Sequence, residues 1–120
     1  MTRDEMAAVM EKVFEECRAL RGCGQLEYAR RAENALANFE HVGERLGVSR
    51  EQVLLVYMEK HLDGIHSWVQ GQRSQREDVR GRINDVIVYA TLLRGMVEDL
   101  AKEGTAVQDD SPQPIDLGHK

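Results

Sequence analysis

The sequence predicts an all-α protein, organised as one four-helix bundle-like domain over residues 1–103 followed by a disordered tail over residues 104–120. Apolar residues recur every three or four positions in four successive segments, which is the spacing of one helix face. Both prolines, Pro112 and Pro114, lie in the tail, so none interrupts these segments. No segment alternates apolar and polar residues as a strand would.

The first two helices are predicted from their ends and their apolar spacing. Thr2 and Glu5 form a capping-box pattern at the start of the first helix, which should end in the glycine-containing turn at residues 21–24. In the second helix, apolar residues recur from Ala32 to Leu46, and Gly47 should end it.

The last two helices have the strongest local signals. Ser49 with Gln52 predicts a capped start for a helix over residues 50–69, whose broad apolar face indicates packing on more than one side. Within it, Gly64 predicts close approach by another helix or a ligand, because glycine costs about 1 kcal/mol relative to alanine there. The fourth helix, residues 79–102, carries a seven-residue apolar seam for helix packing: Val79, Ile83, Val86, Ala90, Leu93, Val97 and Leu100.

Composition narrows the classes of function. The net charge of −5 argues against sequence-independent nucleic-acid binding, but not against a small anion held by a few cations. The longest apolar run, residues 53–58, is too short to cross a membrane. Cys17 and Cys23 form no zinc-type pair, and no signal-peptide pattern is present, so we expect a cytoplasmic protein with reduced thiols.

A polar stripe on the fourth helix is the main candidate site. Asp78, Arg82, Asp85 and Tyr89 are spaced by four, three and four residues beside the apolar seam, and the stripe turns apolar farther along the helix. Such a stripe could line a cleft with a closed floor. The alternative is an ion-pair ladder of Asp78, Arg82 and Asp85 on a solvated face.

The third helix offers a second set of polar residues. Glu59, Asp63 and His66 share a face that could bind a divalent metal, although a solvated charged face is the simpler interpretation. His61 falls on the apolar face, where a hydrogen-bonded core histidine is the more common role. Lys60 and Asp63 lie three residues apart and could simply pair.

Tyr28 lies between the first two helices, where its ring could stack on a base or cover the edge of the core. With its neighbours, it begins a set of segments that resembles a family of small phage and prophage proteins, the nucleotide-modification-associated domain family. The likeness runs from about residue 25 to 100 and implies a link to nucleotides. It rests on Glu27–Ala29, Asn38–Phe39, Leu46–Ser49, Val56–Ile65 and Gly81–Tyr89, most specifically on Lys-His-x-Asp-x-Ile and Gly-Arg-Ile-x-Asp.

A weaker resemblance links residues 84–89 to the last motif of the all-α, MazG-like nucleotide pyrophosphohydrolases, which hold magnesium through Glu-x-x-Glu and Glu-x-x-Asp. This chain departs from them decisively. It contains neither spacing, and Arg82 stands three residues before Asp85. A cation there would repel magnesium and attract phosphate.

Together these features predict a non-catalytic protein that binds a nucleotide-type ligand, without a cofactor or a metal ligand. In a phage, it could sequester a nucleotide signal of host immunity in the host cytoplasm. The predicted ligand contacts are Arg82 and Lys60 for phosphate, Asp63, Asp85 and Asn38 for ribose or base, and Tyr28 or Tyr89 for stacking.

Two alternatives remain open. One is a divergent pyrophosphohydrolase, which would need magnesium, or an accessory protein of nucleotide modification. The other is an acidic inhibitor that binds a host protein. In each case a homo-oligomer is expected, because four short helices can hardly cover the apolar faces of the third and fourth helices.

Overall fold

The computed structural model describes residues 1–24, 34–73 and 76–104, which form four helices and no strand. The helices are α1 (Arg3–Gly24), α2 (Ala37–Leu46), α3 (Arg50–Val69) and α4 (Val79–Lys102). The all-α, four-helix prediction is therefore confirmed. The second helix was predicted to begin near Ala32, but it begins at Ala37, because residues 34–36 form a turn in which Leu36 N–H donates to Asn34 Oδ1. Apart from Gly104, the predicted disordered tail lies outside the described residues.

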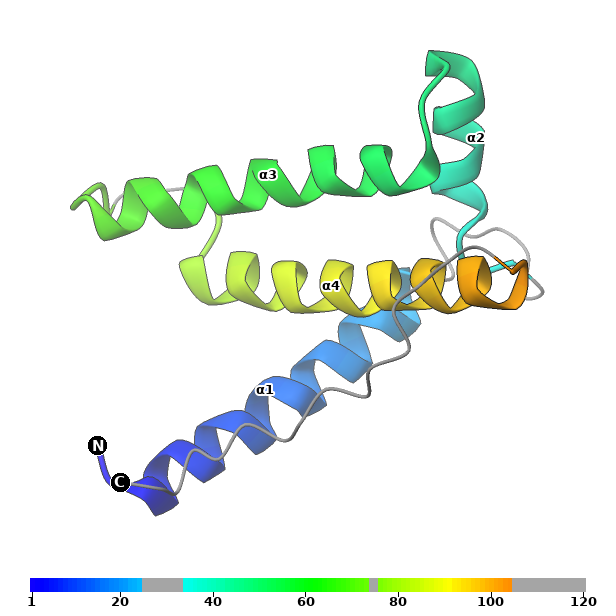
Figure 1. Cartoon of the computed structure of the whole chain (residues 1–120). Coiled ribbons are helices and arrows are strands. Elements are labelled where there is room, and N and C mark those ends of the chain that lie inside the picture. The colour runs from blue at the N-terminus through cyan, green and yellow to red at the C-terminus, as the bar shows by residue number, and fades with distance from the viewer. Residues whose placement is uncertain (25–33, 74–75, 105–120) are drawn as a thin grey trace.

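Helix α4 lies between two other helices (Figure 1). Helices α3 and α4 run side by side in opposite directions, as the short connection between them favours. Helix α1 crosses the other side of α4, and α2 packs across the N-terminal end of α3. The predicted packing of α4 against other helices is thus confirmed, and it brings polar residues of α3 and α4 face to face.

The helix starts follow the local sequence closely. The Glu5 backbone N–H donates to Thr2 Oγ1 at 3.1 Å, and Thr2 N–H donates to the Glu5 carboxylate at 3.0 Å. Ser49 and Gln52 make the same reciprocal pair at the start of α3, with both distances 3.1 Å. Asp78 caps α4 by accepting from the Arg80 backbone N–H at 2.9 Å. These bonds satisfy donors that a helix start leaves unpaired.

A small core joins α2, α3 and α4. Phe39, Val53, Leu54 and Met96 are buried, and Leu54 and Met96 are fully covered. The Phe39 ring lies 5.7 Å from that of Tyr57 and 6.4 Å from that of Tyr89, measured between centroids. Aromatic rings at these separations attract each other beyond their buried area. The core therefore holds α4 in place at Tyr89, and the other residues of the polar stripe lie between Tyr89 and the start of the helix.

Much of α1 is less well covered. The buried Cys17 packs on α4, where its Sγ lies 3.7 Å from the Asn84 carbonyl oxygen. Towards the N-terminus, Met6, Met10 and Phe14 keep 41–45% of their surface exposed. Within the described residues, no helix is long and apolar enough to span a membrane.

Candidate functional site: a polar cluster between α3 and α4

Polar side chains meet where the C-terminal half of α3 passes the start of α4. His61 comes from α3, Arg82 and Asp85 come from α4, and Glu77 lies just before α4. We call these four residues the polar cluster. His61 and Gly64 are three residues apart on α3, as are Arg82 and Asp85 on α4, so each pair lies on one helix face.

His61 lies against Asp85 and Tyr89. Its Nδ1 is 3.4 Å from Asp85 Oδ2, and its side chain is only 15% exposed. The orientation does not make this contact a hydrogen bond, and Nδ1 is buried without a hydrogen-bond partner. The imidazole ring lies 5.6 Å from the Tyr89 ring. A buried polar atom that lacks a partner is uncommon and calls for an explanation.

Arg82 lies directly on Gly64. A Cβ atom added at Gly64 would lie 2.5 Å from Cδ, Nε and Cζ of Arg82, so only glycine leaves room for this side chain. The close approach predicted at Gly64 is therefore confirmed, and the group that approaches is the Arg82 side chain. No alanine could occupy position 64 without moving it.

The Arg82 side chain is 16% exposed, yet its guanidinium makes no hydrogen bond to any described residue. Within the described part of the chain, its one ion pair joins Nη1 to Glu77 Oε2 at 3.7 Å, and its Nε is buried without a partner. A guanidinium carries five N–H donors, and leaving a buried one such as Nε unpaired is unfavourable. Arg82 is therefore able to accept an additional anionic partner.

The charges of the cluster are coupled. Burial raises the pKa of the Asp85 carboxyl above its ordinary value, and the nearby Glu77 carboxylate adds to the increase. His61 and Arg82 act in the opposite direction without cancelling the effect. One ligand-type atom from each of His61, Glu77 and Asp85 lies within 4.8 Å of the other two. The cluster thus offers a cation for an anionic group and three possible ligands for a metal ion.

The structure brings three of the predicted site residues together: Arg82, Asp85 and Tyr89. Lys60 and Asp63 are exposed, and neither has an ion pair or hydrogen bond with a described residue. The α3 residues that face α4 are instead His61 and Gly64.

The other two predicted contacts are not part of the cluster. Asn38 is half-buried on α2 beside Phe39, and no hydrogen bond or ion pair joins it to the cluster in the described part of the chain. Tyr28 lies outside the described residues.

The ion-pair ladder considered for α4 does not form on a solvated face. Asp78 is the helix cap and contacts Arg80, whereas Arg82 turns to Glu77 and is largely covered. The Asp78 cap could have been found from its place directly before the first apolar residue of the helix. Glu77 lies before the helix begins, where helical spacing cannot predict the direction of a side chain, and the sequence analysis therefore missed it.

The metal-binding face considered on α3 is solvated, because Glu59, Asp63 and His66 are all exposed. The metal-type grouping among the described residues is formed by His61, Glu77 and Asp85. It joins positions that are far apart in the sequence, so spacing within one helix could not reveal it.

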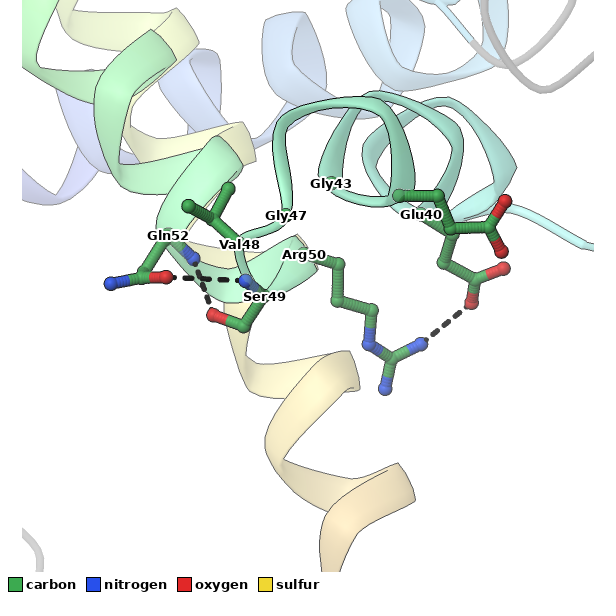
Figure 2. Close-up of a pocket in the computed structure, with 8 residues that line it drawn as sticks. Glu40, Gly43, Gly47, Val48, Ser49, Arg50 and Gln52 are labelled. Carbon is green, nitrogen blue, oxygen red and sulfur yellow. Dashed lines mark hydrogen bonds and ion pairs between the residues drawn. The ribbon is translucent and has the colours of Figure 1, made fainter.

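A surface depression between the end of α2 and the start of α3 lies away from the cluster (Figure 2). There Ser49 pairs with Gln52, and Arg50 Nη1 donates to Glu40 Oε1 at 2.9 Å. Arg50 also donates to Asp99 Oδ2 at 3.2 Å, so it joins α2, α3 and α4. These groups satisfy one another, which identifies the depression as a structural junction.

No protein-family model, curated protein or solved structure matches this chain. The resemblance to the phage nucleotide-modification-associated family therefore stays a prediction from the sequence, and the polar cluster is the basis on which a function can be argued.

Proposed function

We propose that the protein binds a nucleotide-type ligand without transforming it, and that Arg82 contacts the ligand's phosphate. The observation that carries this proposal is that the Arg82 side chain is only 16% exposed, while its guanidinium makes no hydrogen bond to a described residue. The planar guanidinium of arginine can donate two parallel hydrogen bonds to phosphate oxygens, and such charge-assisted bonds are stronger than neutral ones. A phosphate bound at Arg82 would supply the hydrogen-bond acceptors that the guanidinium lacks among the described residues.

Glu77 is the group that a phosphate would displace. Its side chain is 58% exposed, and its contact with Arg82 is long, at 3.7 Å. Because the carboxylate is solvated and the contact is long, the pair contributes little stability, and Glu77 can turn into solvent at small cost. On the other side, Asp85 can accept hydrogen bonds from a ribose or base, and the rings of Tyr89 and His61 offer an aromatic surface.

Binding without hydrolysis is supported by the sequence, which lacks the Glu-x-x-Glu and Glu-x-x-Asp spacings of the pyrophosphohydrolases. The resemblance to phage proteins supports a use in sequestering a nucleotide signal of host immunity, in the host cytoplasm. In this proposal Lys60, Asp63 and Asn38 are not primary contacts, because none of them joins the cluster through an ion pair or hydrogen bond among the described residues.

Calorimetry with a panel of mononucleotides, dinucleotides and cyclic nucleotides tests the proposal, in buffer with EDTA to remove metal ions. Arg82→Met should lose about 1.5–3 kcal/mol of affinity, the scale of hydrogen bonds to charged groups. The matched control is Arg80→Met, because Arg80 lies on the same helix with an 83% exposed side chain. If the two variants bind alike, Arg82 is not the phosphate contact.

Two further variants separate binding from catalysis. Glu77→Gln should tighten nucleotide binding, since it removes the carboxylate that competes for Arg82. Asp85→Asn should weaken binding only modestly, because the amide keeps one acceptor oxygen. An enzyme that used Asp85 to hold magnesium would instead lose all turnover. Product formation by the wild type that Asp85→Asn abolishes would therefore refute non-catalytic binding.

We also propose that the chain forms a homo-oligomer, with α1 in the interface. The supporting observation is the row of partly exposed apolar residues Met6, Val9, Met10 and Phe14, each 39–45% exposed on a helix that packs only on α4 within the described part. Contiguous apolar surface of this kind usually marks an interaction site. Light scattering at micromolar concentration should give a multiple of 13.6 kDa, and Met10→Glu should shift it towards the monomer.

A further inference from the structure

The polar cluster contains the elements of a metal site in addition to its arginine. We propose that His61, Glu77 and Asp85 bind one divalent transition-metal ion of the Zn²⁺ type. The three residues come from α3, from the segment before α4 and from α4, and their ligand-type atoms lie within 4.8 Å of one another. The chain thus brings together one imidazole and two carboxylates, which is a ligand set that zinc accepts.

The geometry of His61 is the second observation. Its Nδ1 is buried without a hydrogen-bond partner, although Asp85 Oδ2 is only 3.4 Å away. Two ligands bound tetrahedrally to one zinc ion at about 2.1 Å each lie about 3.4 Å apart. The distance therefore equals one edge of a tetrahedral zinc site.

Glu77 can complete the site by a small movement. The spread of 4.8 Å must contract, and the Glu77 side chain is free to move because it is 58% exposed and held only by a 3.7 Å contact with Arg82. Two carboxylates neutralise the charge of a divalent ion, while imidazole favours zinc over magnesium. Three protein ligands leave one tetrahedral position open.

The open position connects the metal to the nucleotide proposal, and this step rests on that proposed function. A metal ion that binds the Glu77 carboxylate removes this carboxylate from Arg82, so the guanidinium loses the ion pair with Glu77. A phosphate could then bridge the ion and Arg82, with one oxygen on each. The ion would therefore strengthen the binding of a phosphate-bearing nucleotide that Arg82 also binds without it.

Calorimetric titration of the full, tag-free chain with ZnCl₂ alone tests the metal site, in the absence of any nucleotide. The wild type should bind one ion per chain. His61→Gln and Asp85→Asn should each weaken that binding about tenfold or more, because even changes in groups that only orient metal ligands have effects of this size. The control is His66→Gln, since His66 is an exposed histidine on the same helix and should leave the affinity unchanged.

The two proposals can fail separately. Arg82→Met should tighten zinc binding, because it removes a positive charge next to the site, while it weakens binding of nucleotides. If the wild type shows no saturable zinc binding, or if His61→Gln binds zinc with equal affinity, the metal site is wrong. The nucleotide titrations in EDTA would still test nucleotide binding independently. The helical circular dichroism signal of every variant is measured as well, so that weaker zinc binding can be distinguished from unfolding.

Discussion

The contact between Gly64 and Arg82 can be tested without removing a single polar atom. Gly64→Ala places a Cβ 2.5 Å from Cδ, Nε and Cζ of Arg82, so the guanidinium must leave its place between α3 and α4. Alanine itself favours the helix by about 0.5–1 kcal/mol. Overpacking costs about 1–3 kcal/mol. Because the atoms that must move are the far end of a flexible side chain, only the low end of this cost applies. The free energy of unfolding should therefore stay level or fall by up to about 0.5 kcal/mol, despite the better helix former.

Gly95→Ala is the matched control, because Gly95 lies inside α4 and an added Cβ there meets nothing within 4 Å. It should raise the free energy of unfolding by about 0.5–1 kcal/mol. Urea unfolding followed by circular dichroism measures both, and the difference between the variants isolates the displacement of Arg82. Nucleotide affinity should fall in the Gly64 variant alone. Equal stabilisation by the two substitutions would show that Arg82 is not held on Gly64.

Three further outcomes follow from the core and its junctions. Met96→Ala should lower the free energy of unfolding by about 2–5 kcal/mol in urea titrations, because Met96 is fully buried. Arg50→Met should lower it by about 1–3 kcal/mol, since it leaves partly buried carboxylates unpaired, whereas Arg94→Met at an exposed pair should change little. Burial, with the charges of Glu16 and Asp85, raises the pKa of the Cys17 thiol above 9.0, so the folded state holds this proton more tightly. Stability should therefore fall as the pH rises above about 9, and the fall should be smaller in Cys17→Ala; equal pH profiles would contradict this.

The helices were predictable because their signals are local. The capping pairs Thr2–Glu5 and Ser49–Gln52 form as expected, and the apolar seam of α4 extends over the observed helix. Each signal depends on residues within one or two turns of each other. The face of α4 that packs into the core lies beside this seam, because the core takes Tyr89, Leu92, Leu93 and Met96 from α4, whereas Ile83 and Ala90 of the seam are exposed.

The orientation of α3 was harder to predict. Two polar sets lie side by side on it, and Lys60 and Asp63 were predicted to contact the same ligand as Arg82 and Asp85 of α4. The structure instead turns these two full charges to solvent and places His61 and Gly64 against α4. Side-chain size explains part of the difference, because only glycine at position 64 leaves room for the Arg82 side chain of α4. The position of His61 on the apolar face already pointed to this arrangement.

Glu77 could not be placed from the sequence, because its contact with Arg82 depends on how the chain enters α4. The same holds for the grouping of His61, Glu77 and Asp85, which only tertiary packing creates. No spacing rule along the sequence identifies a cluster that is assembled from two helices. Arg82 could therefore be singled out from the polar stripe of α4, whereas its contact with Glu77 could not.

The most direct measurement identifies what the protein carries when it is purified from cells in which it acts. Wild-type protein and the Arg82→Met variant are prepared in parallel, denatured to release small molecules, and the released material is identified by mass spectrometry. We predict an intact, phosphate-bearing nucleotide from the wild type and strongly reduced recovery from the variant. Recovery of cleavage products alone, of no nucleotide, or of equal amounts from both proteins would contradict non-catalytic nucleotide binding at Arg82.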